Sequence, residues 1–356
     1  MGSPRRGPSH GVSTRRLPAE WEPQSAVMLT WPHAGTDWID QLAAVEAVYM
    51  DIATRIAVYE PVLIVCNDAA SCSDVGERLL AAGVRADRLR LVQAPSDDTW
   101  TRDHGPLTII DADHRIRLID FRFNGWGGKF TAEQDDRITA QVHAAGGFGD
   151  VPLESSRLVL EGGAIETDGL GTALIVRRTL IDPARNPAWD QQAVTAELGD
   201  RLGLTRIHWL EHGWLSGDDT DGHIDTLARF CDPETIVHAV CPDPADPDQA
   251  ALEQLAVELR ALRRPDGRPY RLVPLRQPAP IHDETGQRLP AGYANFLIIN
   301  GAILLPVYQD PADALAIATL GRLFSDRRIE PVDCRALIRQ GGSLHCISMQ
   351  LAAAPG

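Results

Sequence analysis

The chain lacks any long apolar segment. Of its 356 residues 44% are hydrophobic, yet no run approaches the roughly 20 consecutive apolar residues that a membrane-spanning helix needs. The first sixteen residues are rich in Arg, Ser, Gly and Pro and contain no apolar stretch of the kind found in secretory signals. We therefore expect no membrane partner, and we interpret 1–16 as a disordered leader.

Cysteine is sparse, and basic residues are in the minority. Six cysteines without regular spacing do not form the pattern of a disulfide-stabilised secreted protein, so a reducing cytoplasm is the expected location. The formal net charge is −15, and no basic patch is evident that could bind a phosphate backbone. Nucleic acid is therefore not expected as a partner, whereas a negative field favours the approach of a small cation.

A dinucleotide-binding turn of the form Gly-x-Gly-x-x-Gly is also missing after the first predicted strand. The chain instead alternates short apolar strands with amphipathic helices in five cycles, at intervals of roughly 60–70 residues. Segments 158–166 and 296–305 are each predicted as one strand. The missing turn disfavours a doubly wound parallel sheet. Because no linker divides the chain, we favour a repeat architecture in one compact domain.

The segment Gly341-Gly342-Ser343-Leu344-His345-Cys346 lies close to the C-terminus. Most cysteines in apolar segments are small buried hydrophobes, and Cys66 and Cys231 fit that interpretation. Cys346 differs because glycines precede it, and backbone freedom suits a nucleophile that needs room for substrate. His345 points away from it on an extended segment and is left out of the predicted mechanism.

Six short motifs follow one another between Leu17 and Gln350. They are PAEWEP at 18–23, TWPH at 30–33, WTRDHGP at 100–106, LEGG at 160–163, DTDGHID at 219–225 and GGSLHC at 341–346. Together they resemble the agmatine deiminases, within the wider group of bacterial peptidylarginine-deiminase-like proteins. The resemblance implies an α/β fold, the pentein α/β propeller of five ββαβ units around a pseudo-fivefold axis, as a single catalytic domain over 17–352. It also implies hydrolysis of agmatine to N-carbamoylputrescine and ammonia in putrescine biosynthesis, with no metal and no other cofactor, by a homo-oligomer such as a dimer.

The chemistry of a guanidinium group explains these residue types. Its carbon is a poor electrophile until the positive charge is held and oriented, and paired carboxylates such as Asp103 and Asp225 do this through charge-assisted hydrogen bonds. Cys346 is predicted to attack as the thiolate and to form a covalent amidino-cysteine (thiouronium) intermediate. His223 is predicted to protonate the departing ammonia and then to accept a proton from water. Glu161 is predicted to orient His223.

Further residues are predicted to bind the substrate. Asp219 is a candidate to meet the distal amine of agmatine. Trp100 and Trp126 are candidates to line the pocket of the cationic substrate and to bind it through cation–π attraction, and Trp31 is a further candidate. The glycine-rich loop 125–129 is predicted to act as a cover that excludes water.

The acidic segment 219–225 supports a second interpretation. On an extended segment His223 and Asp225, two residues apart, point to the same face and into one pocket. The alternation of Asp and His at positions 219, 221, 223 and 225 also resembles a hydrolase metal site that activates water. That alternative leaves Cys346 unexplained, and sensitivity to a chelator would distinguish it.

The identity of the substrate leaves alternatives within the deiminases. Free arginine and peptidylarginine carry the same guanidinium as agmatine, and an arginine deiminase needs a basic partner for the α-carboxylate. Candidates for that partner are Arg102, Arg177, Arg178 and Arg185. One departure from many agmatine deiminases is Asp221, where they have Asn. A non-catalytic binding protein of the same fold would lack the Cys-His-Asp set that this chain retains.

Overall fold

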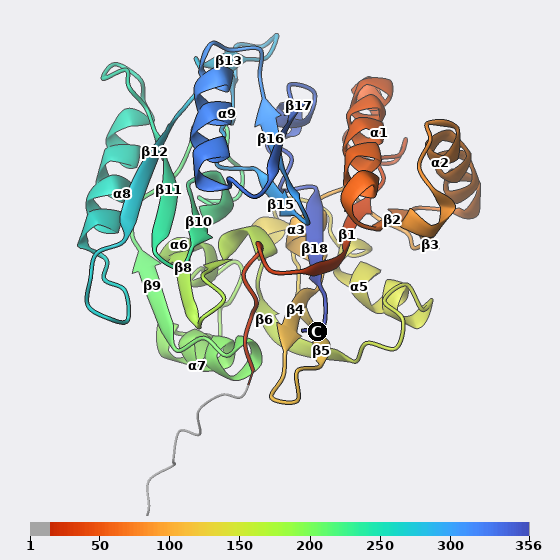
Figure 1. The fold of residues 1–356 in the computed structure, drawn as a ribbon, viewed down its shortest axis with the longest axis horizontal. Coiled ribbons are helices and arrows are strands. Elements are labelled where there is room, and N and C mark those ends of the chain that lie inside the picture. The colour runs from red at the N-terminus through yellow and green to blue at the C-terminus, as the bar shows by residue number, and fades with distance from the viewer. Residues whose placement is uncertain (1–14, 356) are drawn as a thin grey trace, which may run out of the picture.

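The computed structural model describes residues 15–355, and this part of the chain folds into five successive units (Figure 1). Each unit begins with an antiparallel strand pair, continues through a helical connection and ends with a strand parallel to the second one. The mixed α/β class and the five strand–helix cycles predicted from the sequence are therefore confirmed.

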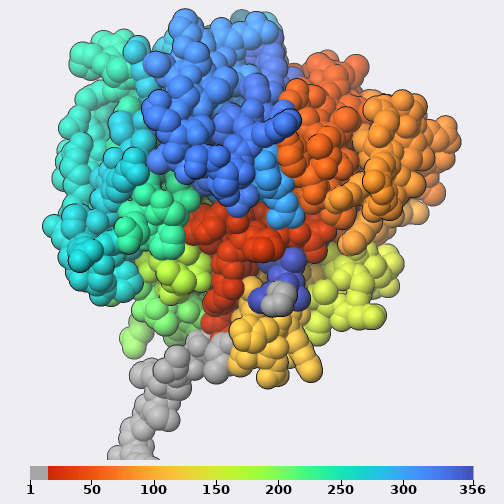
Figure 2. All heavy atoms as spheres, viewed as in Figure 1, coloured from red at the N-terminus to blue at the C-terminus, as the bar shows by residue number. Residues whose placement is uncertain are grey.

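The first unit joins the two ends of the chain. Its strands, in sheet order, are β18 (Ser348–Ala352), β1 (Gln24–Thr30), β2 (Val62–Cys66) and β3 (Leu89–Gln93). Its helices are η1 (Ile39–Gln41), α1 (Leu42–Tyr59), α2 (Ala69–Ala81) and η2 (Ala86–Arg88). The last strand of the chain thus pairs with the first, opposing Met28 to Met349, and Figure 2 shows the blue C-terminal residues against the red N-terminal ones.

The other four units follow the same plan. Their strands are β4 (Leu107–Ile110), β5 (Ile116–Arg122) and β6 (Leu153–Val159); β7 (Glu166–Thr167), β8 (Thr172–Val176) and β9 (Arg206–Leu210); β10 (Ala228–Asp232), β11 (Thr235–Val240) and β12 (Arg271–Arg276); and β15 (Leu297–Ile299), β16 (Ala302–Val307) and β17 (Arg328–Asp333). Their connecting helices are α4 (Gly125–Gly128) and α5 (Asp135–Ala144), α6 (Arg177–Leu180) and α7 (Gln191–Leu202), α8 (Gln249–Ala261), and α9 (Ala312–Leu323). A separate hairpin of β13 (Ile281–His282) and β14 (Arg288–Leu289) precedes the last of these units.

Short segments lead into the first strand of each unit. Four of them contain a helical turn: α3 (Thr101–His104) before β4, η3 (Gly162–Ala164) before β7, η4 (Ile224–Thr226) before β10, and η5 (Leu337–Gln340) before β18. In the fifth, residues 290–296 lead into β15 without one. These segments carry the polar residues of the candidate site.

The middle strands of the sheets form the core. All five residues of β2 are buried, and they pack alternately into two apolar clusters, with Ile64 in one and Leu63 and Val65 in the other. Successive side chains of a strand point to opposite faces, so β2 is covered on both sides. Burying each such side chain contributes about 1.5–3 kcal/mol, which fixes the strands that carry the site segments.

Helix ends follow side-chain signals in the sequence. The Asp68 carboxylate accepts a hydrogen bond from the Ser71 N–H at 2.8 Å and starts α2, and Asp190 caps α7 in the same way. Helix α7 ends at Gly203, whose φ of 71° lies in the left-handed region that glycine reaches without strain.

Two strands predicted from the sequence are wrong in extent. The predicted strand 158–166 breaks at η3, where Gly162 and Gly163 pass too close to neighbouring segments for side chains. The predicted strand 296–305 is a hairpin that turns at Gly301, with φ at +79°. Apolar character alone cannot distinguish one long strand from two joined by a tight turn.

The ends of the chain bear on two further predictions. Most of the predicted leader 1–16 lies outside the described residues, and Arg16 exchanges backbone hydrogen bonds with Ile110. The single domain over 17–352 stays a prediction. Across residues 15–355, no helix combines the length and apolar character needed to cross a bilayer.

Candidate active site

Polar residues from all five lead-in segments converge. They are Asp103 of α3, Glu161 just before η3, His223 and Asp225 around η4, Asn295 before β15, and Cys346 before β18. Each segment enters the first strand of its unit from the same end, so the repeated topology brings together residues that are far apart in the sequence. The five residues predicted to be catalytic are all within this group.

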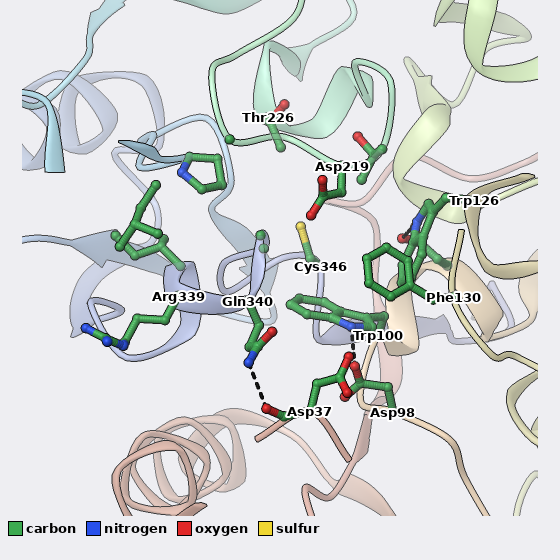
Figure 3. A pocket seen from close by; sticks show the side chains of 18 of the residues that line it. Asp37, Asp98, Trp100, Trp126, Phe130, Asp219, Thr226, Arg339, Gln340 and Cys346 are labelled. Atoms are coloured by element: carbon green, nitrogen blue, oxygen red, sulfur yellow. Dashed lines mark hydrogen bonds between the residues drawn. The ribbon is translucent and has the colours of Figure 1, made fainter. Parts of the chain in front are cut away.

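A cavity of about 230 Å³ opens at Cys346. Figure 3 shows the sulfur directed into it, between the Trp100 ring and the Asp219 carboxylate. Trp126 and Asp103 also line this cavity, so four of the residues predicted to bind substrate lie in its wall, whereas Asp225 and Trp31 do not. Asp225 lies behind the sulfur, with its Oδ2 3.8 Å from Cys346 Sγ.

The Cys346 thiol is buried and faces both a donor and acceptors. Asn295 Nδ2 lies 3.2 Å from Sγ, and among the described residues His223 is not a hydrogen-bond partner of the thiol. Burial, together with the carboxylates of Asp225 and Asp103, raises the pKa of Cys346 well above its usual value. The thiol is therefore protonated at rest, and a cation arriving beside it favours the thiolate.

Asp103 is held by two donors. Its Oδ1 accepts from the Gly163 N–H and its Oδ2 from Trp126 Nε1, each at 3.0 Å. Burial raises its pKa to about 6, and the carboxylates of Asp225 and Glu161 add to the effect while His223 opposes it. Asp103 is thus ionised at neutral pH, in surroundings that would be stabilised by a further positive charge.

Asp225 is fully buried and partnered on one side only. Its Oδ2 accepts from His345 Nδ1 at 2.7 Å and from Asn295 Nδ2 at 3.2 Å. Its Oδ1 has no hydrogen-bond partner among residues 15–355. Burial alone would raise the pKa of Asp225, but His345 and His223 bring it below its usual value. The orphaned oxygen therefore belongs to an ionised carboxylate that lies beside the thiol.

His223 lies between two carboxylates. Its Nε2 is 3.2 Å from Glu161 Oε2, and its Nδ1 is 3.6 Å from Asp103 Oδ1. Burial would lower the pKa of His223, but Asp103 and Glu161 outweigh it and raise the value to about 9. His223 is thus a proton donor at neutral pH. Glu161 is held in turn by Arg185 Nε, at 2.8 and 3.0 Å from its two oxygens.

Glycine is required at two positions by close approach. A Cβ on Gly163 would lie 2.6 Å from His223 Nδ1 and 3.0 Å from Asp103 Oδ1. A Cβ on Gly342 would lie 2.1 Å from a ring carbon of Trp100. The glycines of the LEGG and GGSLHC motifs thus let the catalytic groups and the cavity wall come together.

Trp126 has a strained backbone. Its φ of 54° and ψ of 48° lie in the left-handed region that residues with a Cβ rarely adopt. Its ring packs edge-on against Phe123 and Trp100, with centroids 5.0 and 6.3 Å apart, while its Nε1 bonds Asp103. Strain of this kind persists where the surroundings dictate the conformation, commonly at functional sites.

Comparison with known proteins assigns the family. The Porphyromonas-type peptidyl-arginine deiminases match the chain over residues 16–352. The chain belongs to this family. It is 33% identical to the agmatine deiminase of Stutzerimonas stutzeri, over 95% of each chain.

Solved structures with the same fold are also deiminases by description. A C. jejuni agmatine deiminase with substrate bound, carrying a cysteine-to-serine change, has a TM-score of 0.88 and 31% identity, covering 96% of this chain and 97% of that one. A Porphyromonas gingivalis structure provisionally assigned as an arginine deiminase has a TM-score of 0.87 and 46% identity, covering 96% and 99%. The mixed α/β fold of this family member is thus that of known deiminases.

Two local expectations for the family motifs are corrected. The segment carrying His223 and Asp225 is not extended: η4 begins at Ile224, and the turn, rather than strand alternation, brings both side chains to the site. Trp31 does not line the cavity. It packs in the core against Tyr49, with ring centroids 5.4 Å apart, and donates to Glu46.

The alternation of acidic residues does not form the metal site of the alternative interpretation. The Asp221 carboxylate turns away to Lys129 at 2.7 Å and Arg185 at 2.8 Å, whereas Asp225 faces His345. Over residues 15–355, no three His, Cys, Asp or Glu side chains are grouped as a metal ion would require. The resting loop 125–129 is tied to segment 219–221 through Lys129, and its role as a cover stays a prediction.

Sequence reasoning missed several residues of the site. Asn295 contacts the thiol, Arg185 holds Glu161, and His345 contacts Asp225. An alignment of the repeats would have found Asn295, because it precedes β15 as the other site residues precede their strands. Nothing in the sequence indicated that His345 reaches Asp225, because the contact depends on the path of the chain between η5 and β18.

Proposed function

We propose that the chain is an agmatine deiminase, a hydrolase of C–N bonds in linear amidines that converts agmatine and water to N-carbamoylputrescine and ammonia. One observation carries the proposal: the buried Asp225 Oδ1 has no partner among the described residues, and the Cys346 sulfur lies directly beside the same carboxylate. Guanidinium N–H groups would satisfy this oxygen and Asp103 with charge-assisted hydrogen bonds. The carbon would then lie next to the thiol.

The charges that line the cavity support an amine at the distal end of the substrate. Its arginines are Arg288 and Arg339, and each already pairs with an acid, Arg288 with Asp246 at 2.6 Å and Arg339 with Glu284. Asp219 lines the same cavity. The four arginines considered as partners of an α-carboxylate do not line it. These features favour agmatine over free arginine.

In the first half-reaction, Cys346 Sγ forms a bond to the guanidinium carbon. The bond from that carbon to one terminal nitrogen breaks, and the nitrogen takes a proton from His223 and leaves as ammonia. His223 is left neutral, and the proton of the thiol converts the released ammonia to ammonium. The product is the amidino-cysteine cation, still held by Asp103 and Asp225. The raised pKa of His223 suits this donor role at neutral pH.

In the second half-reaction, water attacks the carbon of the intermediate and gives a proton to His223. The C–S bond breaks, and the sulfur takes that proton to regenerate the thiol. The ureido product is neutral, and the second proton from water stays on His223, which returns to its protonated resting state. Glu161 keeps the His223 ring oriented in both steps, and Arg185 holds Glu161. This chemistry calls on no cofactor.

Further proposals concern architecture and setting. We infer that the five units stand around a pseudo-fivefold axis as a propeller, with the site at its centre; the pairing of β18 with β1 and the shared origin of the site residues support this. A role in putrescine biosynthesis and a homodimer are further proposals that the family resemblance supports. We also propose a cytoplasmic location without nucleic-acid or membrane partners, which the irregular cysteine spacing, the net charge of −15 and the lack of long apolar runs favour. Light scattering would test the dimer.

The function is tested by release of ammonia and ureido product from agmatine, free arginine and an N-blocked arginine amide, each with and without a chelator. We expect turnover of agmatine that survives the chelator and is lost in Cys346→Ala. Cys72→Ala is the matched control, since Cys72 lies on α2 outside the site. Turnover of arginine but not agmatine would overturn the substrate assignment, and chelator sensitivity would overturn the thiol mechanism.

A further inference from the structure

A buried ionic cluster lies behind Asp225 and takes no part in the steps above. His345 Nδ1 is 2.7 Å from Asp225 Oδ2, and its Nε2 is 2.8 Å from Glu20 Oε2. Arg229 donates to the same Glu20 oxygen at 2.8 Å and to Glu166 at 2.7 Å. All five side chains are buried, and Arg229 and Asp225 are fully so. His345 thus joins the site to a second layer of charge.

The hydrogen-bond partners of His345 determine which of its two ring nitrogens carry hydrogen. A carboxylate only accepts, and a neutral imidazole has one donor and one acceptor nitrogen, so it could satisfy one of these two carboxylates but not both. Both carboxylates are ionised: besides His345 itself, Arg229 and Arg102 hold the pKa of Glu20 below its usual value against burial, and His223 and Arg229 add to the effect of His345 in lowering the pKa of Asp225. Both ring nitrogens of His345 must therefore carry hydrogen.

The surroundings can support a buried imidazolium. A buried charge is tolerated when it is paired and hydrogen-bonded. Here His345 lies between two carboxylates, and Glu20 is shared with Arg229 and faces Arg102 at 4.0 Å. The second oxygen of Glu20 accepts from the Ile298 N–H at 2.7 Å. Glu20 is thus a fixed acceptor that holds the ring in place.

The contact has a consequence for Asp225. His345 and Asn295 both donate to Oδ2, which leaves Oδ1 orphaned. A carboxylate turns as a planar unit, so fixing one oxygen fixes the direction of the other. We propose that His345 is a positioning residue: as an imidazolium anchored on Glu20, it aims Asp225 Oδ1 at the guanidinium of the substrate. This role rests on the proposed function, whereas the proton count on His345 does not.

The proton count is tested on the whole protein without substrate. We expect both ring nitrogens of His345 to resonate as N–H in ¹⁵N-histidine NMR at pH 7, with the signal assigned by its disappearance in His345→Asn. His238 is the internal control: it is also buried, its Nδ1 faces the Ala239 carbonyl at 3.3 Å, and burial lowers its pKa. It should show a neutral ring. A neutral His345 ring at pH 7 would overturn the inference.

Two variants separate the contacts of the ring. His345→Asn keeps a donor near the Nδ1 position, toward Asp225, whereas His345→Gln keeps one near the Nε2 position, toward Glu20. We expect the Gln variant to lose about 10- to 100-fold in kcat/KM, mainly through KM, because a charge-assisted hydrogen bond to Asp225 is lost. The Asn variant should lose less than about tenfold. His238→Gln, a matched buried histidine outside the site, should retain wild-type kinetics.

The pH profile gives a readout that a purely structural role would not move. Asp103 sets the acid limb of kcat/KM in the wild type. Without the imidazolium the pKa of Asp225 rises toward that of Asp103, so the acid limb should move to higher pH in His345→Gln but not in His238→Gln. The charged groups that face Asp225 and His345 from the packed elements are Glu20, Arg102, Asp103, Glu166, His223 and Arg229. Equal losses in the Asn and Gln variants with an unmoved acid limb would refute the positioning role.

Failure of the proposed function would look different. In that case wild-type protein would release no ammonia from agmatine, arginine or the blocked amide, and the NMR result would still decide the protonation of His345. If either variant failed to fold, circular dichroism would show it, and the NMR measurement on the wild type would again stand.

Discussion

Replacing Gly163 by alanine inserts one methyl group among three catalytic side chains. An added Cβ would lie 2.6 Å from His223 Nδ1, 3.0 Å from Asp103 Oδ1 and 3.2 Å from Asp225 Oδ2. The backbone of Gly163 does not lie in the left-handed region, so alanine brings no conformational strain of its own. The effect is therefore steric and local.

The distance by which the added Cβ displaces His223 sets the size of the expected loss in rate. Ordinary van der Waals contact for a Cβ begins at 3.4 Å, so His223 must move by about 0.8 Å from its 2.6 Å position, or the backbone must shift by as much. A misplacement of about 1 Å in a catalytic group costs on the order of 100-fold in rate, which corresponds to about 2.7 kcal/mol of transition-state stabilisation. Overpacking at this position should also lower the free energy of unfolding by about 1–3 kcal/mol.

The assay is the steady-state kcat/KM for ammonia release, with urea unfolding of the same preparations. Gly321→Ala, within α9, is the matched control, because its added Cβ would lie at an ordinary contact distance of 3.7 Å from the Ile329 side chain. It should keep full activity and gain up to about 1 kcal/mol of stability, since alanine favours helix over glycine. If Gly163→Ala stayed folded and within about threefold of wild type in kcat/KM, the convergence of His223, Asp103 and Asp225 would be refuted.

Three further outcomes follow from the site. The pH dependence of kcat/KM should be bell-shaped. It should rise through about pH 6 as Asp103 ionises to accept the guanidinium, and fall through about pH 9 as His223 loses the proton that it must donate. An alkaline limb near pH 7 would contradict the raised pKa of His223. Arg185→Met should reduce the free energy of unfolding in urea by about 3–5 kcal/mol, because the buried Glu161 loses its bidentate partner and keeps only His223; Arg185→Lys should lose less, and equal losses would argue against the ion pair. Trp126→Phe keeps an aromatic ring but removes the indole N–H that donates to Asp103 Oδ2, so we expect kcat/KM for agmatine to fall about tenfold in steady-state assays. Unchanged kinetics would show that this hydrogen bond does not orient the Asp103 carboxylate.

The segments that precede the first strand of each unit show which features of the site can be predicted from the sequence. Cys346, His223 and Glu161 were identifiable because a nucleophile, a proton carrier and an acid sit in glycine-flanked motifs whose residue types suit guanidinium chemistry. The extended segment predicted at 223–225 was wrong, because a three-residue 3₁₀ turn leaves no periodic signal. The strand predicted at 296–305 failed for a related reason, since a tight turn at Gly301 interrupts an apolar run without changing its composition.

The sequence by itself determined the reacting groups and the repeated strand–helix order. Both are local properties: a thiol, an imidazole and carboxylates have fixed chemistry, and amphipathic periodicity is set by neighbouring residues. Only the tertiary structure decided which atoms meet. Asn295 lies beside the thiol, and His345 lies between Asp225 and Glu20; these contacts join residues from different units. Arg185 and Glu161 belong to one unit, but the loop after α6 brings them together. Their distances, burial and protonation depend on how the sheets pack, which no short segment of the sequence encodes.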